Sequence, residues 1–271
     1  MSSDVSAFQD VLTKARFVAV LTGAGISAES GIPTFRGAGG LWRNFEAQEV
    51  ASPHAWERDP GLVWEFYNYR RTLMREKRPN AGHYALAELE RKLYDAGRRF
   101  HLVTQNIDDL HLDAGTQHVT RLHGSIWQVR CTGCYEVYIN RDVPITPAFE
   151  GTGDPEEADP KKFEAADLPR CPIEHCRGIL RPNVVWFGEA LDHNDLDEGA
   201  RAAMECDLFL VIGTSAVVHP AAQLVPVAKN SGAAVAEINA ETTQVSELCD
   251  YTFHGNAGEW LPKLFGLHFD T

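Results

Sequence analysis

The sequence predicts an α/β protein in which a doubly wound parallel sheet carries a smaller, inserted lobe. Short apolar runs rich in β-branched residues predict buried strands at 16–22, 100–104, 207–212 and 233–238. Segments of helical composition separate them, most clearly 61–77 and 81–96, and the second has an apolar stripe at helical spacing. Strands that alternate with helices are typical of a parallel sheet.

Size and composition agree with this fold. The 271 residues suffice for one large α/β domain with an insertion, and 44% hydrophobic and 23% charged residues are ordinary for a soluble enzyme. The net charge of −13 argues against a nucleic-acid partner, because phosphate binding depends on clustered Lys and Arg. A basic protein or peptide partner suits this charge better, and we expect the chain to act as a monomer.

The N-terminal residues MSSDVSAFQD carry two acids and no base, which fits neither a secretory signal nor an Arg-rich transit peptide. The most apolar stretch, 208–218, is interrupted by a Gly-Thr-Ser triplet and is too short to cross a bilayer. We therefore expect no membrane partner and a cytoplasmic location for the chain as given. A mitochondrial location follows instead if a transit segment has been removed.

The expected sheet resumes near Val184, which places the smaller lobe inside the larger one. The predicted boundaries are 1–40, 84–124 and 178–271 for the larger, nucleotide-binding domain, and 41–83 with 125–177 for the smaller lobe, which is helical and carries the cysteine pairs.

A glycine-rich turn, Gly23-x-Gly25-x-x-Ala28, follows the first predicted strand and opens a helix. In this context backbone amides can approach a pyrophosphate, as in Rossmann-like dinucleotide sites, although a tight turn without a ligand is the simpler alternative. An acid should end a second strand about 20 residues on in an ordinary NAD dehydrogenase, and the sequence has none there. A polar loop at 30–37 follows instead, which we expect to cover a cofactor.

Two close cysteine pairs indicate a metal site. Cys131-x2-Cys134 and Cys171-x4-Cys176 supply four thiolates, which is a complete tetrahedral set for zinc. Because sulfur fills all four positions, no site remains for a catalytic water. The pattern therefore predicts one structural zinc ion.

Further polar blocks follow predicted strands. Residues 105–108 follow the strand at 100–104, at the end of the sheet where ligands bind, although an Asn/Asp turn or helix cap would also explain them. Residues 213–215 and 239–241 follow two later strands in the same way. His123 follows another β-like segment, and its pKa near neutrality suits a general base, although most of eleven histidines would have surface or core positions.

Together these blocks resemble the signature motifs of the sirtuin family, and they occur in the family's order. They are GAGISAESGIPTFRG, Thr104-Gln105-Asn106-Ile107-Asp108, Leu122-His123-Gly124 and Gly213-Thr214-Ser215, within a resemblance that covers roughly residues 10–265. The segment EFYNYR at 65–70 resembles the Tyr-x-x-Arg signature of the class III deacylases. The segment RPNVVWFGE at 181–189 also fits that class.

The resemblance implies an NAD-dependent protein-lysine deacylase that yields free lysine, nicotinamide and O-acyl-ADP-ribose. His123 would activate a ribose hydroxyl of NAD, Asn106 would orient the ribose and a water, and Glu241 would replace the missing ribose acid. The full set of implied NAD contacts is Gly23, Ala24, Gly25, Ser27, Ala28, Pro33, Thr34, Phe35, Arg36, Trp42, Gln105, Asn106, Ile107, Asp108, Gly213, Thr214, Ser215, Asn239, Ala240, Glu241 and Ala257.

Tyr67 and Arg70 are three residues apart on a predicted helix and so share one face. On an arbitrary helix they would be a core contact and a surface charge. The resemblance instead directs both into an acyl pocket, where they would bind a carboxylate, and Ala51 would leave room for it. It implies removal of succinyl and malonyl groups, with glutaryl a further candidate and only weak deacetylation. The acylated-lysine peptide would pair with the backbone of Val184, Val185, Trp186, Phe187, Gly188 and Glu189.

Two other functions stay open at this point. An NAD-dependent protein ADP-ribosyltransferase would use the same chemistry but pass ADP-ribose to a protein side chain. A non-enzymatic module would bind a partner through its zinc ribbon and sense NAD through the nucleotide site. A hydride-transfer dehydrogenase is disfavoured by the missing ribose acid.

Overall fold

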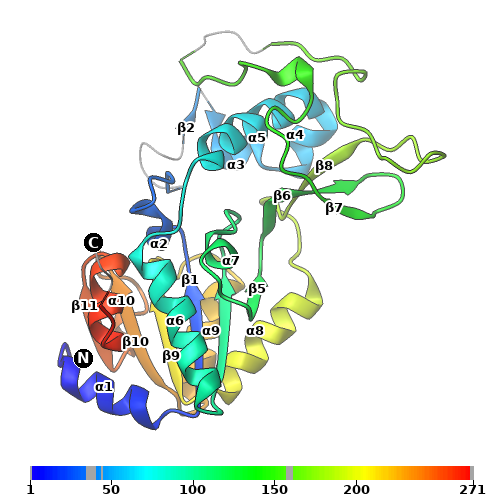
Figure 1. The fold of residues 1–271 in the computed structure, drawn as a ribbon. Helices are drawn as coiled ribbons and strands as arrows, with labels where there is room; N and C mark the ends of the chain where they lie inside the picture. The colour runs from blue at the N-terminus through cyan, green and yellow to red at the C-terminus, as the bar shows by residue number, and fades with distance from the viewer. Residues whose placement is uncertain (1, 35–40, 44, 157–160, 269–271) are drawn as a thin grey trace.

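The computed structural model describes residues 2–34, 41–43, 45–156 and 161–268, and these form two lobes of unequal size (Figure 1). The larger lobe is built on a six-stranded sheet in the order β11-β10-β9-β1-β4-β5, and every strand pairing in it is parallel. The strands are β1 (Phe17–Thr22), β4 (Arg99–Thr104), β5 (Val119–Arg121), β9 (Leu208–Ile212), β10 (Ala234–Asn239) and β11 (Tyr251–His254). The direction of winding reverses between β1 and β9, and ligands bind at such a reversal.

Helices cover both faces of this sheet. One face packs against α1 (Val5–Lys14), α6 (Ala81–Asp95) and α10 (Ala257–Phe265), and the other against α8 (His193–Glu205) and α9 (Leu224–Asn230). Alternate residues of β1 supply the two cores, with Val18 and Val20 in one and Ala19 and Leu21 in the other. Because both faces are covered, every residue of β1 is buried, which explains its continuous apolar sequence. The predicted doubly wound fold is confirmed.

The smaller lobe combines helices with a second, antiparallel sheet. Its helices are α3 (Ala47–Val50), α4 (Pro53–Arg58) and α5 (Pro60–Arg75), and the hairpin β2 (Leu41–Trp42) and β3 (Phe45–Glu46) precedes them. The sheet has the order β7-β6-β8, from β6 (Gly124–Cys131), β7 (Val137–Ile139) and β8 (Leu180–Val184). Asp59 begins α5 by accepting a hydrogen bond from the Leu62 amide (2.9 Å), and Pro60 takes the first helical position.

The remaining elements are short. They are α2 (Gly25–Ala28), α7 (Leu110–Asp113) and the 3₁₀ turns Pro147–Phe149, Ala221–Gln223 and Ser246–Leu248. Among the described residues, no helix is long and apolar enough to cross a membrane.

One expectation about the sheet is wrong. The large sheet does not resume near Val184, because β8 pairs antiparallel with β6 of the small sheet and the next strand of the large sheet is β9. An apolar, β-branched run can pair in either sheet, so the local pattern could not decide this. The lobe boundaries given above remain a prediction, and the pairing of β8 favours starting the last segment of the larger lobe after residue 184.

Candidate active site

A cavity of about 870 Å³ is lined by residues of both lobes. The larger lobe contributes the loops that follow β1, β4, β9 and β10, and the smaller lobe contributes α5 and the chain after β8. The cavity therefore lies at the carboxyl ends of the parallel strands, as expected for a ligand site in this kind of sheet.

Glycines bring two loops of the larger lobe into close contact at this cavity. A Cβ on Gly25 would lie 2.8 Å from the Cα of Gly213, and a Cβ on Gly213 would lie 2.4 Å from the amide nitrogen of Ile26. Gly213 also has a φ of +58°, a backbone conformation that residues other than glycine rarely adopt. Larger residues would push the two loops apart, so these glycines define the shape of the cavity floor.

Asn106 and Asp108 are fixed by hydrogen bonds. The Asn106 side chain donates to the Gly23 carbonyl (3.0 Å) and to Ser27 Oγ (3.3 Å). Ser27 in turn donates to Asp108 Oδ2 (2.8 Å), while the Leu110 amide donates to Asp108 Oδ1 (2.9 Å). Both side chains are buried, and burial raises the pKa of Asp108. The glycine turn and the segment after β4 therefore form one polar unit.

The loops after β9 and β10 extend this wall of the cavity. Gln105 donates to Thr214 Oγ1 (2.9 Å), and Asn239 donates to the Thr214 carbonyl (3.2 Å). These bonds join the ends of β4, β9 and β10. Glu241, which was expected to contact a ribose of NAD, also lines the cavity.

His123 follows β5 and lies in the cavity wall. Its Nδ1 is 2.8 Å from the Gln105 carbonyl oxygen, which can only accept, so Nδ1 carries the proton and Nε2 is left with its lone pair. Burial lowers the pKa of His123, and the bond to Gln105 opposes this effect only in part. The side chain is therefore neutral at pH 7, which is the state that a general base requires.

Tyr67 and Arg70 line the smaller lobe's side of the same cavity, one turn apart on α5. Tyr67 is 1% exposed, and burial raises its pKa to about 12, so its hydroxyl is a neutral donor at pH 7. Burial lowers the pKa of Arg70 to about 10, which leaves it cationic at the same pH. Its guanidinium carbon lies 5.6 Å from the ring centre of Phe66. Ala51 is buried in the same wall.

Residues 184–189 all line the cavity, as the sequence analysis expected. The segment is held at two points, because the Val185 amide donates to the His123 carbonyl (3.0 Å) and the Phe187 amide to the Ala51 carbonyl (3.0 Å). These two amides are therefore already in use, so a peptide would have to pair with other backbone groups of the segment. Pairing with a peptide stays a prediction.

One expected NAD contact does not line the cavity, and two others are not described. Trp42 is not among the described residues that line it, because the indole is buried in the smaller lobe and donates to the Gly153 carbonyl (2.9 Å). Phe35 and Arg36 lie outside the described residues. The other residues named for NAD and substrate all line the cavity.

Part of the wall was not predicted from the sequence. Residues 217–220 and 242–244 line the cavity and directly extend the loops that were predicted after β9 and β10. Their position beyond the carboxyl ends of two strands was the available signal.

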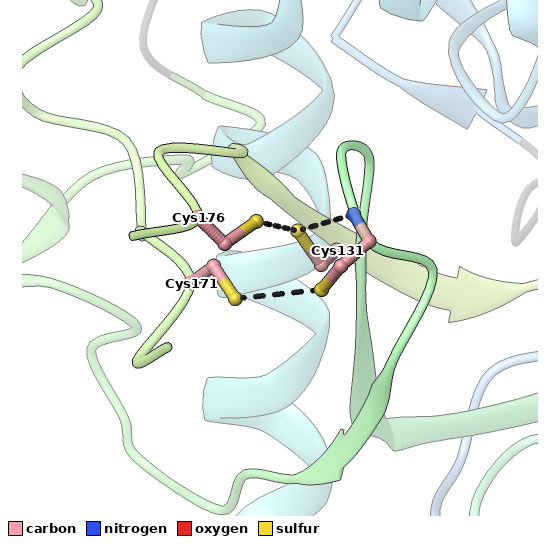
Figure 2. Close-up of side chains that lie close together, drawn as sticks. Cys131, Cys171 and Cys176 are labelled. Atoms are coloured by element: carbon pink, nitrogen blue, oxygen red, sulfur yellow. Dashed lines mark hydrogen bonds between the residues drawn. The ribbon is translucent and has the colours of Figure 1, made fainter. Parts of the chain in front are cut away.

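The four cysteines expected to bind zinc lie together. Cys131 ends β6, and Figure 2 shows it beside Cys171 and Cys176. The four sulfur atoms all lie within 4.8 Å of one another, with 3.5 Å between Cys131 and Cys176 and 3.7 Å between Cys134 and Cys171. A tetrahedral zinc ion with Zn–S bonds of about 2.3 Å places its sulfurs about 3.8 Å apart, so the cluster fits this ion. None of the four is among the residues that line the cavity, which favours a structural role.

Comparison with known proteins identifies related chains. A family model described as the Sir2 family matches residues 23–220. The mitochondrial NAD-dependent protein deacylase sirtuin-5 of Danio rerio is 49% identical over 271 residues, which covers 98% of this chain and 88% of the relative. An NAD-dependent protein deacylase of Pyrococcus furiosus is 46% identical over 255 residues, 94% of each chain.

Solved structures agree. A Sir2 homologue in complex with NAD is 40% identical, with a TM-score of 0.82 over 98% of this chain and 93% of that chain. A Sir2 complex with a p53 peptide and NAD⁺ is 30% identical, with a TM-score of 0.78 over 97% of this chain and 98% of that chain. With the family motifs, the cavity and the cysteine cluster in their expected places, this chain belongs to the Sir2 family.

Proposed function

We propose that this chain is an NAD-dependent protein-lysine deacylase that removes acidic acyl groups, chiefly succinyl and malonyl. One observation carries the proposal: a neutral histidine and a Tyr–Arg pair line the same cavity, His123 from the larger lobe and Tyr67 with Arg70 from the smaller. The relatives named as NAD-dependent protein deacylases support the reaction class. Glutaryl is a further candidate substrate, and deacetylation should be weak.

The dinucleotide would lie along the loops of the larger lobe, whose close packing depends on Gly25 and Gly213. Bound NAD would supply a ribose whose anomeric carbon exchanges nicotinamide for the acyl oxygen. His123 Nε2 would accept the proton of a ribose hydroxyl, since the Gln105 carbonyl fixes the proton of the ring on Nδ1. Asn106 would orient the ribose and a water, and Asp108 would accept a hydrogen bond from the nicotinamide carboxamide.

Tyr67 and Arg70 would bind the acid end of the acyl group. A phenol that keeps its proton and a guanidinium that keeps its charge are both donors at pH 7. A carboxylate satisfies both, whereas an acetyl group has no carboxylate and leaves polar groups in the pocket without a substrate partner. Ala51 keeps the wall open for the longer chain.

The cysteine cluster would hold one zinc ion that stabilises the smaller lobe. Cys131 ends β6, and β6 pairs with β8, which leads into residues 184–189 of the cavity wall. The ion would therefore support substrate binding through the sheet, without contacting the substrate.

We further propose that the chain acts as a monomer on acylated proteins or peptides, with no nucleic acid as partner. The net charge of −13 supports the exclusion of nucleic acid. The mitochondrial relatives favour a mitochondrial location over a cytoplasmic one. Sedimentation of the purified chain tests the oligomeric state.

Mass spectrometry tests the function directly. Purified protein and NAD would be incubated with acetyl-, malonyl-, succinyl- and glutaryl-lysine versions of one peptide, and free lysine and O-acyl-ADP-ribose would be measured. We expect succinyl- and malonyl-lysine to react fastest. Failure to release lysine from any acidic acyl peptide would reject the proposal, and transfer of ADP-ribose to protein without acyl-lysine would favour a transferase.

A further inference from the structure

Trp186 has a buried polar group that lacks a well-formed hydrogen bond. Its side chain is 2% exposed, and its indole Nε1–H makes no hydrogen bond of normal geometry to any described residue. A buried donor without an acceptor is destabilising, and such groups are rare in folded proteins. A ligand that supplies the missing acceptor would explain why this one is kept.

The indole lies beside Tyr67 in the cavity wall. Trp186 lines the cavity together with Tyr67 and Arg70, and a weak hydrogen bond from its N–H to the Tyr67 hydroxyl oxygen lowers the pKa of that hydroxyl. The indole thus adds a third donor where the phenol and the guanidinium already point to an acid. A carboxylate has about four lone-pair sites on its two oxygens, so it can accept from all three.

The indole is also held rigidly. The guanidinium carbon of Arg181 lies 3.4 Å from the ring centre of Trp186, and the ring of Trp56 packs 5.6 Å away. Arg181 pairs with both oxygens of Glu189 (2.6 and 2.9 Å), and Glu189 Oε2 accepts from the Trp186 amide (2.9 Å). Ring and backbone are therefore fixed before any substrate binds.

Arg181 does not take over acid recognition itself. It is buried, and its charge is neutralised by the bidentate contact to Glu189. The pair therefore holds the indole in place and contributes little net charge to the pocket.

We propose that the Trp186 indole N–H donates a hydrogen bond to the carboxylate of the acyl group, as a third recognition group beside Tyr67 and Arg70. This inference rests on the acidic-acyl deacylase function proposed above. It gives the side chain of Trp186 a role in selecting the acyl group, separate from the expected backbone contact with the peptide.

The test compares succinyl- and butyryl-lysine forms of one peptide, since these acyl groups have the same carbon chain and differ in the terminal carboxylate. Trp186→Phe keeps an aromatic ring under Arg181 and removes the N–H. We expect kcat/KM for succinyl-lysine to fall about 10- to 100-fold, the effect of one hydrogen bond to a charged group, mainly through KM. Any loss for butyryl-lysine should be smaller, so that the succinyl-to-butyryl ratio of kcat/KM falls. Trp260→Phe makes the same change in an indole that is not among the cavity lining and donates to the His254 carbonyl, and it should leave the succinyl-to-butyryl ratio unchanged.

A second variant removes the ambiguity of a smaller ring. Benzothienylalanine at position 186 replaces the N–H by sulfur and keeps the bicyclic shape, and it should lower the succinyl rate as Trp186→Phe does. A wild-type succinyl-to-butyryl ratio in both variants would overturn the inference. A loss that vanishes in a Tyr67→Phe background would also overturn direct donation, because the indole would then act only through the phenol.

These outcomes are separate from failure of the proposed function. Wild-type protein that releases no lysine from succinyl-lysine peptide would reject the function itself. Wild-type activity with unaltered selectivity in the Trp186 variants would reject only this inference.

Discussion

Replacement of Arg70 by methionine is the sharpest test of the acyl pocket. Methionine is apolar and of similar length, so it can keep the contact that Arg70 makes with the Phe66 ring. It removes the only charge of the Tyr–Arg pair while leaving Tyr67 and the helix in place. The change therefore isolates the guanidinium as the proposed partner of the acid.

The magnitude follows from the contact that is lost. A hydrogen bond to a charged group contributes about 1.5–3 kcal/mol net, and about 1.4 kcal/mol corresponds to a factor of ten in rate. Arg70→Met should therefore lower kcat/KM for succinyl-lysine by about 10- to 100-fold. The rate for acetyl-lysine should stay the same or rise, because the variant lacks a guanidinium to which the acetyl group offers no carboxylate.

The assay follows release of nicotinamide and free lysine from succinyl- and acetyl-lysine peptides at concentrations below KM. Arg75→Met is the matched control, since Arg75 lies exposed at the end of the same helix. An unchanged succinyl-to-acetyl ratio in Arg70→Met would refute the reasoning. An equal loss for both substrates would also refute it, because it would indicate a general defect.

Three further predictions concern the base, the metal and stability. His123→Ala should lower kcat about 10²- to 10⁴-fold. Because burial lowers the His123 pKa, the acid limb of the wild-type pH–rate profile should have its midpoint below pH 6.5. A midpoint above that value would contradict the assignment of His123 as the base. Cys134→Ser should lose zinc by atomic absorption and lose desuccinylation, whereas Cys206→Ser, outside the cluster, should keep both. Burial lowers the pKa of His83 to about 4, so the unfolded chain binds more protons than the folded chain below pH 6.5. The free energy of unfolding should therefore decrease as the pH is lowered from 6.5, by up to about 3 kcal/mol near pH 4. Urea unfolding of His83→Gln should show a smaller pH dependence than wild type, and an equal one would count against this.

Much of the fold is determined locally. The strands β1, β4, β9 and β10 were predictable because a strand covered on both faces is apolar along most of its length. The glycine turn and the four cysteines were predictable for a similar reason, since close loop packing and a tetrahedral metal each admit few residue types. These features depend on short stretches of sequence, and so the sequence alone determined them.

Other features depend on partners distant in the chain. The run at β8 satisfies the requirements of either sheet, and only tertiary pairing with β6 placed it in the smaller lobe. Trp42 was expected to contact NAD, but its indole is buried and donates to Gly153, more than a hundred positions away in the chain.

The part of the cavity lined by Tyr67, Arg70 and Trp186 shows the same division most clearly. The spacing of Tyr67 and Arg70 on one helix face was visible in the sequence, because helical geometry is local. The buried indole of Trp186 was not, because it comes from a segment more than a hundred residues further along the chain and its acceptors depend on how the lobes pack. The sequence determined which chemical groups are available, and the tertiary structure decided which of them share one cavity, since hydrogen bonds act over about 3 Å regardless of separation along the chain.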